Sequence, residues 1–228
     1  MKNGVSHPDD CKAKIGVTLV EMLIVLAVIT LLVSMVVGIA ARLDNQGKER
    51  LAKNTFALLN AALGQFQDYG YHYKSEEYRD FEFPIDCNSL SKPDLESELG
   101  KALDMPVEIT IIGGGTYDPN YSGSEALYFF LSQVPASRQV LDKIDKSLIT
   151  SEGSDKSPME IKIGDKRYPL QRIIDPWGKT IHYSYYDNGN EGPTTEPQPP
   201  NDDPRNFPII TSAGPDRVFG TADDITNR

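Results

Sequence analysis

An uninterrupted apolar stretch near the N-terminus constrains this 228-residue chain more than any other feature. From Val17 to Ala41 the only formal charge is Glu21, and most of the residues after it are Leu, Ile, Val, Met and Ala. Twenty helical residues at about 1.5 Å each span about 30 Å, which is the thickness of the hydrocarbon core of a bilayer. The sequence therefore predicts a transmembrane helix over residues 17–41.

The segment before this helix, residues 1–16, differs from an ordinary secretory signal. Such a signal has a short apolar core followed by small residues at the cleavage site, whereas here the small residue Gly16 precedes the apolar run. Lys12 and Lys14 stand just before the run. Because lysines favour the cytoplasmic side of a bilayer, we expect the C-terminal part of the chain to lie on the opposite side.

Glu21 requires an explanation in a helix that enters a bilayer. A charged side chain that faces lipid costs about 2.5–3.5 kcal/mol on insertion scales, so an ionisable residue in such a helix is a functional candidate. We therefore expect Glu21 to have a cationic partner. The alternative is a plain membrane anchor that tolerates a glutamate at the interface.

The string Gly16-Val17-Thr18-Leu19-Val20-Glu21, followed by the apolar helix, resembles the class III prepilin signal of type IV pilins and type II secretion pseudopilins. In that family a prepilin peptidase cuts after the glycine and methylates the new N-terminal residue. The resemblance implies cleavage after Gly16 and N-methylation of Val17. It also implies that Glu21, at the fifth mature position, directs assembly. In a filament Glu21 could pair with the α-amino group of Val17 on a neighbouring subunit, because an unpaired buried charge is costly.

The remaining residues, 42–228, have the size of one soluble domain. Acidic residues outnumber basic ones, 33 to 23, and no basic run stands out that could neutralise phosphates. We therefore expect no nucleic-acid partner. The chain has two cysteines, Cys11 and Cys87, and the first would leave with the leader. This excludes an intramolecular disulfide in the mature chain.

Residues 42–69 show an amphipathic pattern with steps of three and four residues, which is typical of a helix. The stripe consists of Leu51, Thr55, Leu59, Ala62, Phe66 and Tyr69. Gly70 is the expected end of the helix. The sequence thus predicts one long helix whose second half packs on a globular head.

The middle of the chain carries weaker signals. We expect a helix over 90–103 and a strand over 107–112 that ends in a turn at 113–115. Ser122 and Glu125 have the spacing of a capping box in front of a short helix over 126–131. Pro135 should interrupt that helix, and another is expected over 137–148. Residues 74–165 as a whole are interpreted as an insertion relative to compact pseudopilins.

The C-terminal part predicts a small antiparallel sheet. Asp175-Pro176-Trp177-Gly178 has the form of a turn, and the alternating residues 180–186 follow it as a strand. This turn resembles the one that precedes the C-terminal sheet of major pseudopilins, and Trp177 is expected to pack against the core. Residues 188–206 are rich in proline and predict a surface loop. The predicted fold class is α+β and pilin-like, with a long N-terminal helix packed on this sheet.

The chain ends with a strand and a loop that contains Asp216, Asp223 and Asp224. Carboxylate and carbonyl oxygens are the ligands that calcium prefers, and a solvated acidic turn is the alternative. The loop resembles the calcium loop that closes the head of the major pseudopilin. The resemblance implies calcium as a cofactor, held by these three side chains and by carbonyl groups near Ser212 and Ala213.

Taken as a whole, the sequence resembles the type IV pilin and type II secretion pseudopilin family, and most nearly the major, G-type pseudopilin. The resemblance implies a structural subunit rather than an enzyme, with a single helix in the bacterial inner membrane and its head in the periplasm. Its partners would be the prepilin peptidase, copies of itself, other pseudopilins and the inner-membrane assembly platform. The assembled periplasmic filament, the pseudopilus, would support protein export across the outer membrane.

Two other functions remain open at this stage. A type IV pilus subunit, used in adhesion, motility or DNA uptake, would carry the same N-terminal signal. A membrane-tethered periplasmic enzyme is the third possibility. Against an enzyme, the chain has only three histidines, and no motif of a serine hydrolase or a metalloprotease is present.

Overall fold

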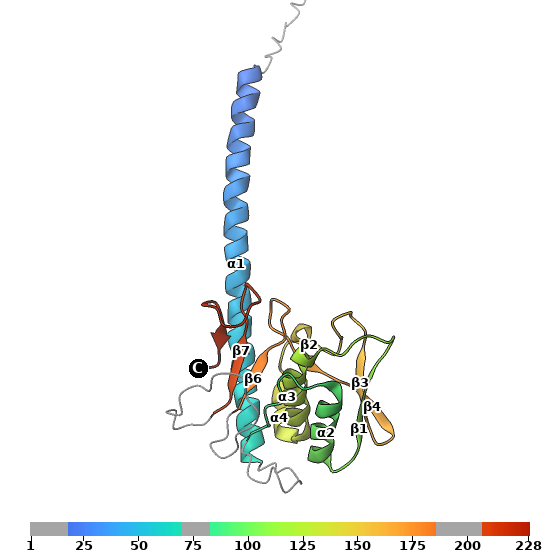
Figure 1. Ribbon diagram of the computed structural model, residues 1–228. Coiled ribbons are helices and arrows are strands. Elements are labelled where there is room, and N and C mark those ends of the chain that lie inside the picture. The colour runs from blue at the N-terminus through green and yellow to red at the C-terminus, as the bar shows by residue number, and fades with distance from the viewer. Residues whose placement is uncertain (1–17, 70–82, 186–206) are drawn as a thin grey trace, which may run out of the picture. The chain divides into compact units, whose positions relative to one another are not determined.

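The computed structural model describes residues 18–69, 83–185 and 207–228, with side chains everywhere except at 36–42. Two compact units divide the chain, residues 1–44 and residues 45–228. Helix α1 (Leu19–Asp68) begins in the first unit and ends in the second. All the other described elements belong to the second unit, which is the head (Figure 1).

The described part of the first unit is Thr18 and the start of α1, up to Asp44. Every large apolar side chain from Leu19 to Met35 is exposed, and the least exposed of them, Ile29, still shows 49% of its surface. Among the residues that the structure describes, no helix is sufficiently long and apolar to pass through a membrane.

The part of α1 in the head has one buried face. Its buried side chains are Ala52, Thr55, Phe56, Leu59, Ala62, Leu63 and Phe66. The predicted stripe is thus confirmed from Thr55 to Phe66. It is wrong at Tyr69, which follows the last helical residue and is 62% exposed. Gly70, the predicted helix end, lies outside the described residues.

Three α-helices, two short 3-10 helices (Pro119–Tyr121 and Lys146–Leu148) and three antiparallel sheets form the rest of the described head (Figure 1). The helices are α2 (Lys92–Leu103), α3 (Ser122–Gln133) and α4 (Pro135–Leu141). One sheet has the order β1-β3-β4, with strands Val107–Ile111, Met159–Ile163 and Lys166–Pro169. Another pairs β2 (Ile149–Thr150) with β5 (Arg172–Ile173). The third has the order β6-β7-β8, with strands His182–Ser184, Ile209–Ser212 and Ile225–Thr226.

The C-terminal sheet, β6-β7-β8, packs into the same core as α1. Tyr183 of β6 pairs with Ile210 of β7, and both side chains are fully buried. They belong to one hydrophobic cluster with Leu59, Leu63 and Phe66 of α1. The predicted α+β architecture of a long N-terminal helix and a C-terminal antiparallel sheet is therefore confirmed.

The middle segment packs into this core as well. Helix α3 is buried along most of its length, because it lies against the strands that follow the middle segment. The Ser124 hydroxyl accepts a hydrogen bond from the backbone N–H of Ile173 at 3.0 Å and lies 3.1 Å from the carbonyl of the same residue. The segment interpreted as an insertion thus shares the core of the head.

The capping box predicted at Ser122 is wrong. Helix α3 starts at Ser122, and its N-cap residue, Tyr121, makes no side-chain cap. The Ser122 hydroxyl donates to the Cys87 carbonyl at 2.6 Å and accepts the backbone N–H of Leu90 at 3.0 Å. Contacts with a distant segment therefore override the local capping pattern.

Other predicted boundaries are partly correct. Helix α2 and strands β1 and β6 lie within the predicted ranges. Pro135 does end one helix, but it also starts the next, α4, which stops at Leu141 rather than continuing to Leu148. A short 3-10 turn follows at Lys146–Leu148. The predicted loop over 188–206 lies largely outside the described residues.

The edge strand β4 is exposed along its whole length. It contains Lys166, Arg167 and Pro169, and Arg167 reaches Glu160 of β3 at 3.5 Å. Charged residues and proline are typical of edge strands that do not add further strands.

Candidate functional site

The first candidate site is the start of α1. Gly16 and Val17, the predicted cleavage and methylation residues, lie outside the described part of the chain. The next residue, Thr18, is the N-cap: its hydroxyl accepts the backbone N–H of Glu21 at 3.2 Å, and its carbonyl accepts that of Met22 at 3.1 Å. A side-chain oxygen in this position satisfies one of the otherwise unpaired N–H groups of the first helical turn.

Glu21 is therefore held in the first turn of the helix, three residues after its cap. A negative charge there is favourable, because the N-terminal end of a helix carries a partial positive charge. The side chain of Glu21 is exposed in the isolated chain. Thr18 is a residue that the sequence analysis missed, although Thr-x-x-Glu before an apolar run is a recognised helix-start pattern. The pairing of Glu21 with a neighbouring chain stays a prediction.

The second candidate site is the C-terminal loop, residues 213–224. Asp223 accepts the Asp216 backbone N–H at 3.0 Å and the Thr221 hydroxyl at 2.6 Å. These hydrogen bonds lower the pKa of Asp223, with the Thr221 hydroxyl as the larger cause. Asp224 accepts the Gly220 N–H at 2.7 Å. Asp223 and Asp224, two of the predicted calcium ligands, thus stabilise the loop through hydrogen bonds to its own backbone and to Thr221.

Gly214 allows the two ends of this loop to meet. Its φ is +65°, and a Cβ atom on it would lie 2.3 Å from the carbonyl oxygen of Asp223. Such a contact is impossible without a shift of the backbone, so only glycine fits this position. The close approach is what brings Asp216 and Asp223 within hydrogen-bond distance.

Asp175 connects the turn before β6 to the loop. This buried carboxylate accepts the backbone N–H groups of Trp177 at 3.0 Å and Lys179 at 2.8 Å with one oxygen. Its other oxygen accepts the Ser212 hydroxyl at 2.7 Å, and Ser212 in turn accepts the N–H of Gly214 at 3.1 Å. Ser212, predicted as a carbonyl ligand, therefore has a structural role through its side chain.

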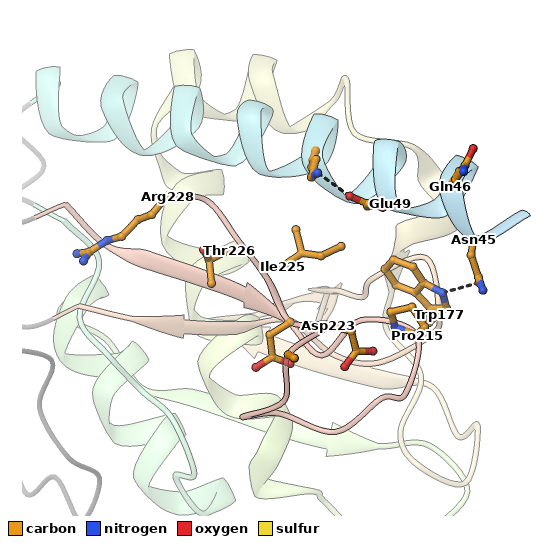
Figure 2. A pocket seen from close by; sticks show the side chains of 12 residues that line it. Asn45, Gln46, Glu49, Trp177, Pro215, Asp223, Ile225, Thr226 and Arg228 are labelled. Carbon is orange, nitrogen blue, oxygen red and sulfur yellow. Dashed lines mark hydrogen bonds and ion pairs between the residues drawn. The ribbon is translucent and has the colours of Figure 1, made fainter. Parts of the chain in front are cut away.

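Trp177 lies at the same end of the head. Trp177 is 6% exposed and thus buried, but it lies outside the main hydrophobic cluster against which it was expected to pack. Its indole N–H donates to the Asn45 side chain at 3.4 Å, as Figure 2 shows. Beside it a groove of about 470 Å³ separates α1 from the loop. Glu49 and Lys53, an ion pair at 2.6 Å, line one wall, and Asp223 lines the other.

The donor atoms of the loop can be compared with the needs of a calcium ion. All are oxygens, and Asp224 Oδ1 is buried without a hydrogen-bond partner, which suits a hard cation. Ser212 and Ala213, the predicted carbonyl ligands, are both buried. However, no three acidic, histidine or cysteine side chains gather as a metal-binding group within the described ranges. Calcium binding stays a prediction.

Comparison with known proteins bears on the first site. The prokaryotic N-terminal methylation motif matches residues 11–37, which include Gly16, Val17 and Glu21. This motif is the prepilin signal of type IV pilin-like proteins, and it implies processing by a prepilin peptidase and assembly into pilus-like filaments. Searches of curated proteins and of solved structures give no match.

Proposed function

We propose that this chain is a structural subunit of a type II secretion pseudopilus. The observation that carries the proposal is the methylation motif, in which Glu21 follows the predicted cleavage point at the spacing of a pilin-like assembly residue. The exposed apolar surface from Leu19 to Met35 supports it. A helix that is apolar on all sides needs lipid or other helices around it, and a filament of parallel helices provides both.

The proposed mechanism of filament assembly depends on the α-amino group of Val17 and the carboxylate of Glu21. Removal of residues 1–16 creates a positive α-amino group on Val17. The next subunit presents Glu21 in the first turn of its helix, capped by Thr18. Pairing these opposite charges in the apolar layer favours a neighbour in the correct axial position, because any other position leaves a charge unpaired. The proposed location is the inner membrane, with the head in the periplasm.

The most direct test is mass spectrometry of the mature N-terminus after expression of the full chain with a prepilin peptidase. The expected product starts at Val17 and carries one additional methyl group. The Gly16→Asp variant is the control, and it should keep its leader. A wild-type product that still starts at Met1 would refute the proposed processing and with it the assembly mechanism.

A type IV pilus subunit is the alternative, and the signal at residues 11–37 is compatible with both kinds of filament. Deletion of the chain in its host separates them. We expect exported proteins to accumulate in the periplasm, with surface filaments unchanged. Loss of surface filaments with normal export would favour the pilus.

We further propose that the C-terminal loop binds calcium through Asp216, Asp223 and Asp224, with carbonyl groups near Ser212 and Ala213. A ligand that binds only the folded state stabilises it, by about 2.7 kcal/mol when its free concentration is one hundred times the dissociation constant. Chelation should therefore lower the melting temperature of the full chain in detergent. The Asp223→Asn variant should lose this response, whereas Asp155→Asn, in another exposed turn, should keep it. A wild-type melting temperature that chelation leaves unchanged would remove the calcium proposal and leave the filament proposal intact.

A further inference from the structure

A polar cluster lies between α3 and β5, and its Glu125 and Arg172 are buried. It consists of Tyr117, Tyr121, Glu125, Arg172 and Thr180. Glu125 belongs to α3 in the middle segment, and Arg172 opens β5 in the C-terminal part. The cluster therefore joins two regions that are far apart in the sequence.

Glu125 is fully buried, but only half of its carboxyl group has a partner. Oε2 accepts the Tyr117 hydroxyl at 2.8 Å. Oε1 has no hydrogen-bond partner and lies 4.0 Å from Nη1 of Arg172, which also has none. An ionised carboxylate with an unsatisfied buried oxygen is costly, and this separation is too long for a hydrogen bond to recover the cost.

Arg172 is held in place by groups other than Glu125. Its Nε donates to the Thr180 hydroxyl at 3.2 Å, and its guanidinium carbon lies 3.7 Å from the centre of the Tyr121 ring. A guanidinium over an aromatic face gains a favourable cation–π interaction. The cation can therefore stay in the head when the carboxyl group is neutral.

We propose that Glu125 is a proton-binding site of the folded head, which takes up a proton in mild acid and thereby strengthens the junction between α3 and β5. A neutral carboxyl group no longer needs a full set of donors around it. The Tyr117 hydroxyl can still hydrogen-bond to it, because a hydroxyl both donates and accepts. The ligand of this site is the proton, and the site is separate from both candidate sites described above.

The groups that surround Glu125 shift its pKa in both directions, and the upward shift is the larger. Burial is the main cause that raises its pKa, to about 7, and the charge of Asp118 adds to this. The Tyr117 hydrogen bond and the Arg172 charge act in the opposite direction. Tyr121 also faces the cluster, and burial raises its pKa, as it does that of Tyr117. The cost of burying the charge thus outweighs the attraction of Arg172.

The sign of the pH effect follows from comparing the two states. An unfolded glutamate binds its proton near pH 4.5, whereas Glu125 in the folded head does so at about 7. Between these values the folded state holds more protons than the unfolded state, so this group makes the head more stable as the pH falls through that range. The contribution is lost as the pH rises through the folded-state value.

The test is the melting temperature of the full chain in detergent, measured from about pH 5 to about pH 8. Glu125→Gln mimics the neutral carboxyl group and should remove a fall of several degrees that the wild type shows as the pH rises. Glu108→Gln, at an exposed position on β1, is the matched control and should behave as the wild type does. Equal pH profiles of wild type and Glu125→Gln would overturn the proposal.

If Glu125→Gln does not fold, a second variant tests whether Glu125 is the group that titrates. Tyr117→Phe removes the hydrogen bond that favours the ionised carboxylate, so the pH at which the melting temperature changes should move upward. A change that stays at the wild-type pH would show that Glu125 is not the group that titrates.

Discussion

Replacement of Glu21 with alanine is expected to abolish the incorporation of the chain into filaments while the chain remains in the membrane. In the proposed filament, the variant would leave the α-amino group of Val17 on the neighbouring subunit unpaired in an apolar layer. Loss of one partner from a buried ion pair costs about 3–5 kcal/mol, which corresponds to about a hundredfold or more in affinity. Insertion should improve, because the charge that opposes it is gone.

The measurement is the fraction of subunits that sediments with sheared or detergent-released filaments, compared with the fraction in membranes. Thr18→Ala is the matched control, since it removes the cap of α1 but keeps the charge of Glu21. That change should cost about 1 kcal/mol at the helix start and leave assembly in place. Normal filaments from the Glu21→Ala variant would contradict the assembly role.

The second large effect is expected at Asp175. The Asp175→Ala variant leaves three donors without their acceptor: the backbone N–H groups of Trp177 and Lys179 and the Ser212 hydroxyl. Each unsatisfied buried donor costs about 1–3 kcal/mol, and such costs are not additive. We therefore expect the free energy of unfolding to fall by about 3–5 kcal/mol.

Denaturant unfolding of the full chain in detergent can measure this change. Trp177 is the only tryptophan and is buried next to Asp175 in the same turn, so its fluorescence reports on this end of the head. Ser212→Ala keeps the two backbone hydrogen bonds of Asp175, loses its own bonds to Asp175 and Gly214, and should cost less, about 1–2 kcal/mol. If Asp175→Ala unfolds at the wild-type denaturant concentration, the carboxylate does not hold the turn and the loop together.

The sequence predicted those parts of the fold that depend on long, regular patterns. Helix α1 follows from its uninterrupted apolar run and the amphipathic pattern over 42–69, and the turn at 175–178 before β6 follows from its proline and glycine. The β3–β4 hairpin was missed, although Met159, Ile161 and Ile163 alternate and the two-residue turn Gly164-Asp165 follows. The residues of this segment do carry the sequence pattern of a hairpin.

Other features could not be read from the sequence. The Ser122 hydroxyl contacts Cys87, 35 residues earlier, and Asp175 binds Ser212, 37 residues later. Such contacts depend on which segments the fold brings together, and a local pattern cannot supply that information. The methylation motif over residues 11–37 could be predicted because it is a continuous string of residues and does not depend on which segments the fold brings together.

The exposed edge strand β4 matters once many heads stand close together. A subunit that polymerises through its N-terminal helix brings copies of the same sheet edge to high local concentration, which is the condition under which strands of different chains can join and form amyloid-like stacks. Lys166 and Arg167 repel a second copy of themselves, and Pro169 lacks the backbone N–H that a new strand would need. In the proposed filament, β4 would therefore oppose the addition of strands between neighbouring heads.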